Sequence, residues 1–207
     1  MLLDADDSQL VLVDYQVRLM PVIFENERVL ANATCLARMA QTLQVPVWAT
    51  EQMPDKLGPT VSAVLAAIEA AGGKTMAKAN FSAMADGLGE WLRPPVRKQM
   101  MGGNARSLPK HLQKAAPEAE EARATIVIAG CEAHVCLLQT ALDLLEKEFE
   151  VWVVTDACSS RSERNRDAAF DRLAGNGAEL VTTEMVAFEW LGSAEHPAFK
   201  EVLGLIK

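Results

Sequence analysis

The sequence predicts an α/β protein with a three-layer, doubly wound architecture around a six-stranded, mainly parallel sheet. Short, nearly continuous apolar segments alternate along the chain with segments whose apolar residues recur every three or four positions. The first kind is typical of buried strands, and the second is typical of helices that face a core. Strands without alternating polar residues are expected to be covered on both faces, as in a parallel sheet between two helix layers.

Each expected strand is a short apolar segment. Strands are expected over residues 8–14, 45–50, 74–81, 124–130, 149–157 and 178–183. Helical periodicity is clear in the first helix, where Val29, Ala33 and Leu36 lie three or four positions apart. Helices are expected over residues 27–44, 60–71, 135–148 and 162–174, with another ending at Trp91 and short helices closing the chain. Together these elements form one expected domain, residues 1–207.

One segment interrupts this alternation. Residues 94–123 are rich in Pro and Gly, basic in their first part and acidic in their last. The segment is too long for an ordinary connection between a helix and a strand. We therefore expect an insertion here that serves as an active-site cover or an oligomer contact.

Composition and charge narrow the class of protein. A net charge of −8 and a pI near 5.0 argue against a nucleic-acid binder, and no apolar run approaches the roughly 20 residues that span a bilayer. The acidic N-terminus lacks the features of a signal peptide, so a soluble, cytoplasmic protein is expected. The four cysteines are expected to be free thiols, and the three histidines lie too far apart in sequence to indicate a metal site.

Polar side chains follow several of the expected strands. In a sheet of this kind the ligand site lies outside the carboxyl ends of the strands. The residues that this rule selects are Asp14, Glu51, Gln52, Lys78, the stretch 130–136 and Asp156. They are expected to converge on one edge of the sheet.

Cys136 is the candidate nucleophile at this edge. It is expected in the first turn of a helix, where free backbone N–H groups and the helix dipole stabilise a thiolate, so its pKa is expected to fall. The same N–H groups can hold the oxyanion that forms when a thiolate attacks a carbonyl. A small buried core thiol is the alternative explanation, and it is the expected role of Cys35, Cys131 and Cys158.

Asp14 and Lys78 are the candidate partners of this thiol. An acid that ends a buried strand can accept the thiol proton, or it can simply cap a loop or pair with a cation. Lys78 lies in an otherwise apolar stretch, where burial beside Asp14 would keep the lysine paired. Its charge would then favour both the thiolate and the oxyanion, although an ordinary solvated lysine is the alternative.

Several separated motifs resemble the isochorismatase-like cysteine hydrolase superfamily, and most closely its isochorismatase-domain-containing proteins. The motifs are VDYQ (13–16), TEQMPDKLGPTV (50–61), GCEAHVCLLQTALDLL (130–145), VVTDACSSRS (153–162) and the C-terminal HPAFKEVLGLIK. The resemblance covers nearly the whole chain except residues 94–123, and it implies the isochorismatase-like hydrolase fold.

The resemblance also implies roles for individual residues. Asp14 would be the base, Lys78 the charge stabiliser and Cys136 the nucleophile. A cis peptide would join Cys131 to Glu132, and the backbone amides of Glu132 and Cys136 would form the oxyanion hole. No metal or organic cofactor is implied. The stretch TEQMPDKLG has no histidine, which disfavours a metal-dependent nicotinamidase, and the presence of Cys136 disfavours vinyl-ether hydrolysis.

Other residues near these motifs are candidates for binding or structural roles. Gln16, Glu51, Gln52 and Phe81 are candidate pocket residues, and the alternative for each is an ordinary loop or core residue. Glu132 is expected to anchor its loop, and His134 to serve in packing or an interface. The arginines of DACSSRSERNRDAA are interpreted as the solvated face of a helix.

The predicted function is hydrolysis of a small amide or related C–N bond through a covalent thioester. The substrate is expected to be a small molecule, and the protein a homo-oligomer. Two alternatives stay open. One is a non-catalytic oligomeric or partner-binding protein that retains the fold, and the other is a thiol redox sensor that uses Cys131 and Cys136.

Overall fold

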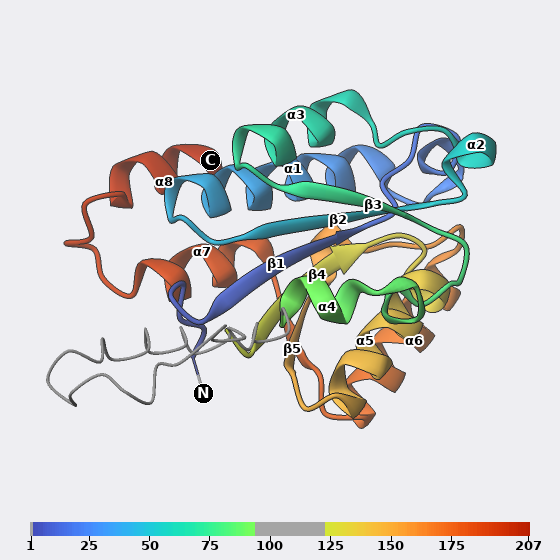
Figure 1. The fold of residues 1–207 in the computed structure, drawn as a ribbon. Coiled ribbons are helices and arrows are strands. Elements are labelled where there is room, and N and C mark those ends of the chain that lie inside the picture. The colour runs from blue at the N-terminus through green and yellow to red at the C-terminus, as the bar shows by residue number, and fades with distance from the viewer. Residues whose placement is uncertain (1, 94–122) are drawn as a thin grey trace, which may run out of the picture.

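A six-stranded, all-parallel sheet forms the centre of the computed structural model, which describes residues 2–93 and 123–207 (Figure 1). The spatial order is β3-β2-β1-β4-β5-β6. The strands are β1 (Ser8–Val13), β2 (Val47–Gln52), β3 (Lys74–Lys78), β4 (Thr125–Gly130), β5 (Glu150–Val154) and β6 (Glu179–Val181). The predicted fold class is confirmed, and every strand pair is parallel.

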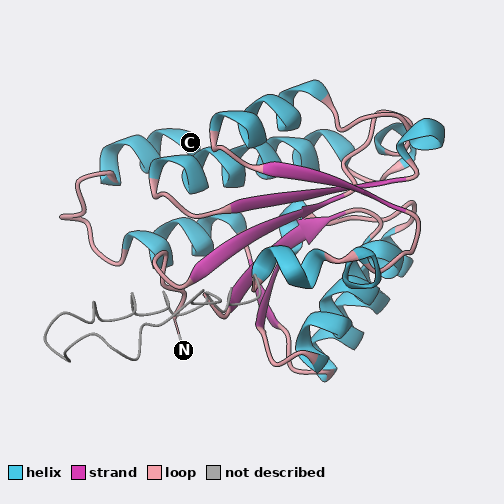
Figure 2. Cartoon of the chain, viewed as in Figure 1, coloured by secondary structure: helices cyan, strands magenta, loops and turns pink. Residues whose placement is uncertain are grey.

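Helices cover both faces of the sheet (Figure 2). One layer consists of α1 (Asn26–Thr42), α3 (Ser62–Ala70), α7 (Thr183–Leu191) and α8 (Phe199–Leu205). The other consists of α4 (Leu88–Leu92), α5 (Leu138–Glu146) and α6 (Glu163–Gly175), while the single turn α2 (Pro54–Leu57) follows β2. In the described ranges, no helix is both long enough and apolar enough to cross a membrane.

The strand order creates a switch point between β1 and β4. From β1 the chain winds outward through β2 to β3, and it then returns to β4 on the other side of β1. From β4 it winds outward in the opposite direction through β5 to β6. The connections that leave β1 and β4 therefore diverge to opposite faces, and in sheets of this kind the ligand site lies outside the carboxyl ends of these two strands.

The expected insertion at residues 94–123 lies outside the described residues, apart from Arg123. Its two flanks meet at the amino-terminal end of β1. There the side-chain amide of Gln9 donates hydrogen bonds to the carbonyls of Leu92, at 3.1 Å, and Arg123, at 2.9 Å. The chain therefore leaves and re-enters the described structure at the edge opposite the carboxyl ends of the strands.

Several element boundaries differ from those expected. The third strand ends at Lys78 because the chain then curls back, so that the Lys78 ammonium bonds to the carbonyls of Asn80 and Phe81. The fifth strand ends at Val154 and continues as a 3-10 turn, Thr155–Ala157. The helix after β4 does not start as a regular α-helix. A π-helical turn, Ala133–Leu137, precedes α5.

Gly130 is required where β4 passes β1. Its φ is +155°, and a Cβ built on it would lie only 2.3 Å from the carbonyl oxygen of Val13. We expect Gly130→Ala to lower the free energy of unfolding by about 2 kcal/mol or more, because the strands must separate or the backbone must distort. Urea unfolding followed by tryptophan fluorescence measures the change.

Gly175→Ala is the matched control for this substitution. Gly175 is the last residue of α6, and a Cβ there would meet nothing within 4 Å. Alanine is the better helix former, so this variant should be as stable as the parent or slightly more stable. Equal stability of the two alanine variants would show that the contact with Val13 does not restrict position 130.

Candidate active site

Asp14 and Lys78 form a buried ion pair at the carboxyl edge of the sheet. Their charged atoms, Asp14 Oδ2 and Lys78 Nζ, are 2.8 Å apart, and neither side chain has exposed surface. Asp14 follows directly after β1, whereas Lys78 ends β3, two strands away. The long lysine side chain spans this distance. The pairing offsets the cost of burying each charge.

The two carboxylate oxygens of Asp14 have different surroundings. Oδ1 accepts a hydrogen bond of 2.7 Å from the hydroxyl of Thr50 on β2. Oδ2 faces Lys78 at ion-pair distance but accepts no well-directed hydrogen bond from the described residues. The backbone of Asp14 is held as well, because its N–H donates to the Thr50 carbonyl at 3.1 Å. The carboxylate is thus fixed in place with one oxygen still able to accept a proton.

Gln52 connects the ion pair to Cys136. Its side-chain oxygen accepts a hydrogen bond of 2.7 Å from Lys78 Nζ, and the Sγ atom of Cys136 lies 3.8 Å from the same oxygen. The Gln52 amide nitrogen donates to the carbonyl of Ala79 at 2.7 Å, which orients the side chain. The structure therefore brings together the three residues that the sequence selected as nucleophile, base and charge stabiliser.

Cys136 lies in the π-helical turn, not in the first turn of an α-helix as expected. It is 6% exposed. Burial is the largest influence on its thiol, followed by the negative charge of Asp14, and the pKa is raised to about 12 despite the opposing positive charge of Lys78. The expectation of a lowered pKa is therefore wrong. Cys136 rests as a thiol beside an ionised pair.

We expect Asp14→Asn and Lys78→Met to change the alkylation of Cys136 in opposite directions. Removing the Asp14 charge should lower the thiol pKa, whereas removing the Lys78 charge should raise it further. At pH 8 the thiolate fraction, and hence the rate of reaction with iodoacetamide, should rise in the first variant and fall in the second. Rate profiles between pH 7 and 10, with peptide mapping to separate the four cysteines, measure both effects. Unchanged profiles would contradict this charge balance.

The segment between β4 and the π-helical turn runs beside the segment that follows β5. The Cys131–Glu132 peptide bond is cis. The Ala133 N–H donates to the Ser159 carbonyl at 2.7 Å, and the His134 ring nitrogen Nδ1 lies 2.9 Å from the Ser160 hydroxyl. These contacts hold the segment that carries Cys136 in a defined position.

Glu132 is paired with Arg161 in the same region. Two bonds join the guanidinium to the carboxylate, Nε to Oε1 at 2.8 Å and Nη2 to Oε2 at 2.9 Å. These hydrogen bonds are the main reason that the pKa of Glu132 is lowered. Glu132 therefore anchors its loop, as expected, mainly through this side-chain ion pair and also through a 3.4 Å hydrogen bond from the Arg161 backbone N–H.

Comparison with known proteins identifies the family. A model of the isochorismatase domain matches residues 8–185. The chain belongs to the isochorismatase domain family. The chain is 34% identical over 202 residues to isochorismatase domain-containing protein 2B of Mus musculus, which covers 98% of this chain and 82% of that protein. Family membership supports a hydrolase as the general function.

Two solved structures extend the comparison. The structure of MAR1 ribonuclease from Caenorhabditis elegans is 30% identical with a TM-score of 0.82, and the match covers 100% of this chain and 92% of that one. The YcaC gene product of Escherichia coli, described as an octameric hydrolase of unknown specificity, is 22% identical with a TM-score of 0.74. That match covers 99% of this chain and 95% of the YcaC chain, and at this identity it shows the shared fold.

The four expected pocket residues of this isochorismatase-domain protein lie in different settings. The Gln52 side chain contacts both Lys78 and Cys136, whereas Phe81 contacts Lys78 through its backbone carbonyl at 3.1 Å. The Gln16 amide donates to the carbonyls of Gln52, at 3.0 Å, and Gly58, at 2.6 Å, so it ties two loops together. Glu51 accepts hydrogen bonds from the N–H and hydroxyl of Thr60. Phe81 is 54% exposed. A role in substrate binding stays a prediction for all four.

Thr50 and Arg161 are the functional candidates that sequence reasoning missed. Thr50 lies two residues before Gln52 on the same strand, so both side chains point to one face. That spacing could have identified Thr50. Arg161 was assigned to a solvated helix face, but it precedes α6 and binds Glu132. Asp156 also follows a strand at this edge, β5, and its carboxylate accepts hydrogen bonds from the N–H and hydroxyl of Thr183 at the start of α7.

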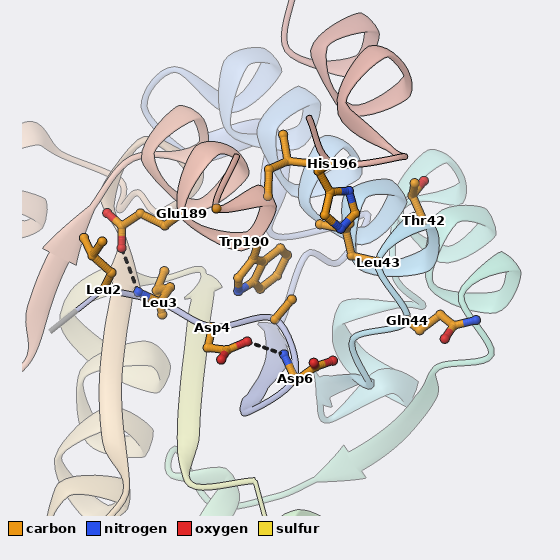
Figure 3. A pocket seen from close by; sticks show the side chains of 13 residues that line it. Leu2, Leu3, Asp4, Asp6, Thr42, Leu43, Gln44, Glu189, Trp190 and His196 are labelled. Carbon is orange, nitrogen blue, oxygen red and sulfur yellow. Dashed lines mark hydrogen bonds between the residues drawn. The ribbon is translucent and has the colours of Figure 1, made fainter. Parts of the chain in front are cut away.

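A separate cavity of about 630 Å³ lies at the opposite edge of the sheet (Figure 3). Its walls come from the N-terminal residues, the end of α1, and α7 with the loop that follows. Two hydrogen bonds of 2.9 Å, from Leu3 N–H to Glu189 Oε2 and from Asp6 N–H to Asp4 Oδ1, join residues of its lining. The lining includes neither Asp14, Lys78 nor Cys136, so this cavity is not part of the candidate active site.

Proposed function

We propose that this protein is a cysteine hydrolase that acts on a small amide or a related C–N bond through a covalent thioester. The observation that carries the proposal is the buried Asp14–Lys78 ion pair beside Cys136 at the switch point of the sheet. A charged pair without exposed surface is costly to bury, and in this position it suits proton transfer to and from a neighbouring thiol.

The cycle begins with the thiol form of Cys136. Asp14 accepts the thiol proton as Sγ attacks the substrate carbonyl, so that a full thiolate need not exist beforehand. The oxyanion is stabilised by Lys78 and by the amides of Glu132 and Cys136. Collapse of this intermediate breaks the C–N bond, and the leaving nitrogen takes the proton from Asp14.

Hydrolysis of the thioester completes the cycle. Water attacks the acyl carbon, Asp14 again accepts a proton, and the carboxylic acid leaves as Sγ recovers its proton. The ammonium of Lys78 remains paired with Asp14 or with the oxyanion at each step. No metal ion or organic cofactor enters this cycle.

The proposed substrate is a small neutral molecule, and the proposed assembly is a homo-oligomer. A relative is named a ribonuclease, but a net charge of −8 is unfavourable for an RNA substrate, so a small neutral molecule is proposed. The octameric state of the YcaC product is compatible with the expected homo-oligomer. The homo-oligomer and the cytoplasmic location stay predictions.

The test is a search for turnover together with capture of the acyl-enzyme. Simple aliphatic amides, carbamoyl compounds and nicotinamide are assayed for ammonia release, with a short RNA as a separate arm. The expected result is ammonia release from at least one C–N substrate, and an acyl mass on the Cys136 peptide after rapid acid quenching. Turnover with no acyl mass on Cys136, or RNA cleavage that persists in Cys136→Ala, would contradict the proposal.

A further inference from the structure

We propose that Arg161 is a positioning residue that aims the backbone amide of Glu132 at the oxyanion. This inference rests on the proposed function, since it assigns a support to the oxyanion hole of the same site. Arg161 is assigned this role because its guanidinium donates two hydrogen bonds to the side chain of Glu132. The backbone N–H of Glu132 is the group that would stabilise the oxyanion.

Glu132 and Arg161 form a bidentate ion pair. Two parallel bonds of 2.8 and 2.9 Å join the planar guanidinium to both carboxylate oxygens, and the Arg161 backbone N–H adds a longer contact of 3.4 Å to Oε1. Two-point pairing restricts rotation in a way that a single contact cannot. The Glu132 side chain is 8% exposed, so its carboxylate has little access to water as an alternative partner.

The surroundings of the Glu132 backbone support this role. Glu132 directly precedes the π-helical turn, Ala133–Leu137, that carries Cys136. No described residue accepts a hydrogen bond from the Glu132 N–H, whereas the next amide, that of Ala133, is bonded to Ser159. An amide without a partner beside the candidate nucleophile is available to a substrate oxygen.

The position of the Glu132 amide should affect only those reactions of Cys136 that form an oxyanion. Acylation by p-nitrophenyl acetate forms the S–C bond through a tetrahedral oxyanion, after which p-nitrophenolate leaves with the electron pair of the broken C–O bond. Alkylation by iodoacetamide forms the S–C bond directly as iodide leaves, with no oxyanion on the carbonyl. In both reactions the Cys136 sulfur is the nucleophile and the thiol proton is lost. Only the acylation passes through an oxyanion, so only its rate should depend on the oxyanion hole.

The experiment compares these two rates in Arg161→Met, Arg161→Lys and Glu132→Gln, with Arg164→Met as the matched control. Arg164 is an exposed arginine within α6. Acylation should slow about 10- to 100-fold in Arg161→Met and in Glu132→Gln, with partial recovery in Arg161→Lys. Alkylation should stay within about 3-fold of the parent in every variant, and Arg164→Met should match the parent in both reactions.

The outcomes distinguish a positioning role of Arg161 from a purely structural role. An equal fall in both rates would show that Arg161 only maintains the structure, and unchanged acylation in Arg161→Met and Glu132→Gln would overturn the positioning role. If Arg161→Met does not fold, Arg161→Lys and Glu132→Gln decide the question. A parent protein that alkylates at Cys136 but never forms an acetyl thioester would instead contradict the proposed function.

Discussion

Cys136→Ala is expected to abolish turnover of any C–N substrate found for this protein. Alanine removes the sulfur that would form the proposed thioester, and Cys131, the other described thiol that experiences the charge of Asp14, has no exposed surface. The expected loss in kcat/KM is at least about 10³-fold, because nucleophile, base and oxyanion hole act as one unit. Ammonia release under saturating and limiting substrate measures kcat and kcat/KM. Stability should change little, because the substitution is small and removes no charge.

Cys35→Ser is the control for this prediction. Cys35 is half-buried on α1, and its thiol donates to the carbonyl of Leu205, far in the fold from Asp14. Activity of this variant should equal that of the parent, and the thioester should still form. Full activity of Cys136→Ala would favour the alternative in which Cys136 is a buried core thiol. A reversible disulfide between Cys131 and Cys136 in the oxidised parent would favour the redox alternative.

The fold was predictable because the uninterrupted apolar sequence of each strand indicates that the strand is buried on both faces. Uninterrupted apolar segments require cover on both faces, and their alternation with helices gives a parallel sheet. The boundaries were less predictable, because contacts distant in sequence decide them. β3 stops at Lys78, for example, because the following carbonyls turn back to bond its ammonium.

The candidate site was predictable to the extent that its residues end strands. Asp14 and Cys136 follow the two strands that meet at the switch point, and the resemblance pointed to Lys78. The raised pKa of Cys136 was not predictable. The sequence indicates a helix N-terminus, which would lower the pKa, but it does not show the burial of the thiol or its closeness to Asp14, which raise it. Arg161 was missed for a similar reason. Its sequence neighbours predict a solvated helix, and only the parallel course of the segments after β4 and β5 brings it to Glu132.

Lys78→Met is expected to lower the free energy of unfolding by about 3–5 kcal/mol. Methionine matches the length of the lysine but leaves the Asp14 carboxylate charged and unpaired, with no exposed surface. The double variant Asp14→Asn/Lys78→Met should be more stable than the sum of the two single changes predicts, because no isolated charge remains. Asparagine suits position 14, where φ is +56°, since it tolerates the left-handed region better than most residues.

Lys74→Met is the matched control on the same strand. Lys74 is exposed, and its ammonium lies 5.9 Å from the centre of the Trp48 ring. An interaction of this kind at an exposed site contributes about 0.5–1 kcal/mol, so this variant should lose no more than that. Urea unfolding at one pH measures the free energy of unfolding of the parent, the two single variants and the double variant, and together these values give the coupling free energy between Asp14 and Lys78. If Lys78→Met were no less stable than Lys74→Met, the pair would not be a mutually dependent buried ion pair, and the proton-transfer role assigned to it would lose its physical basis.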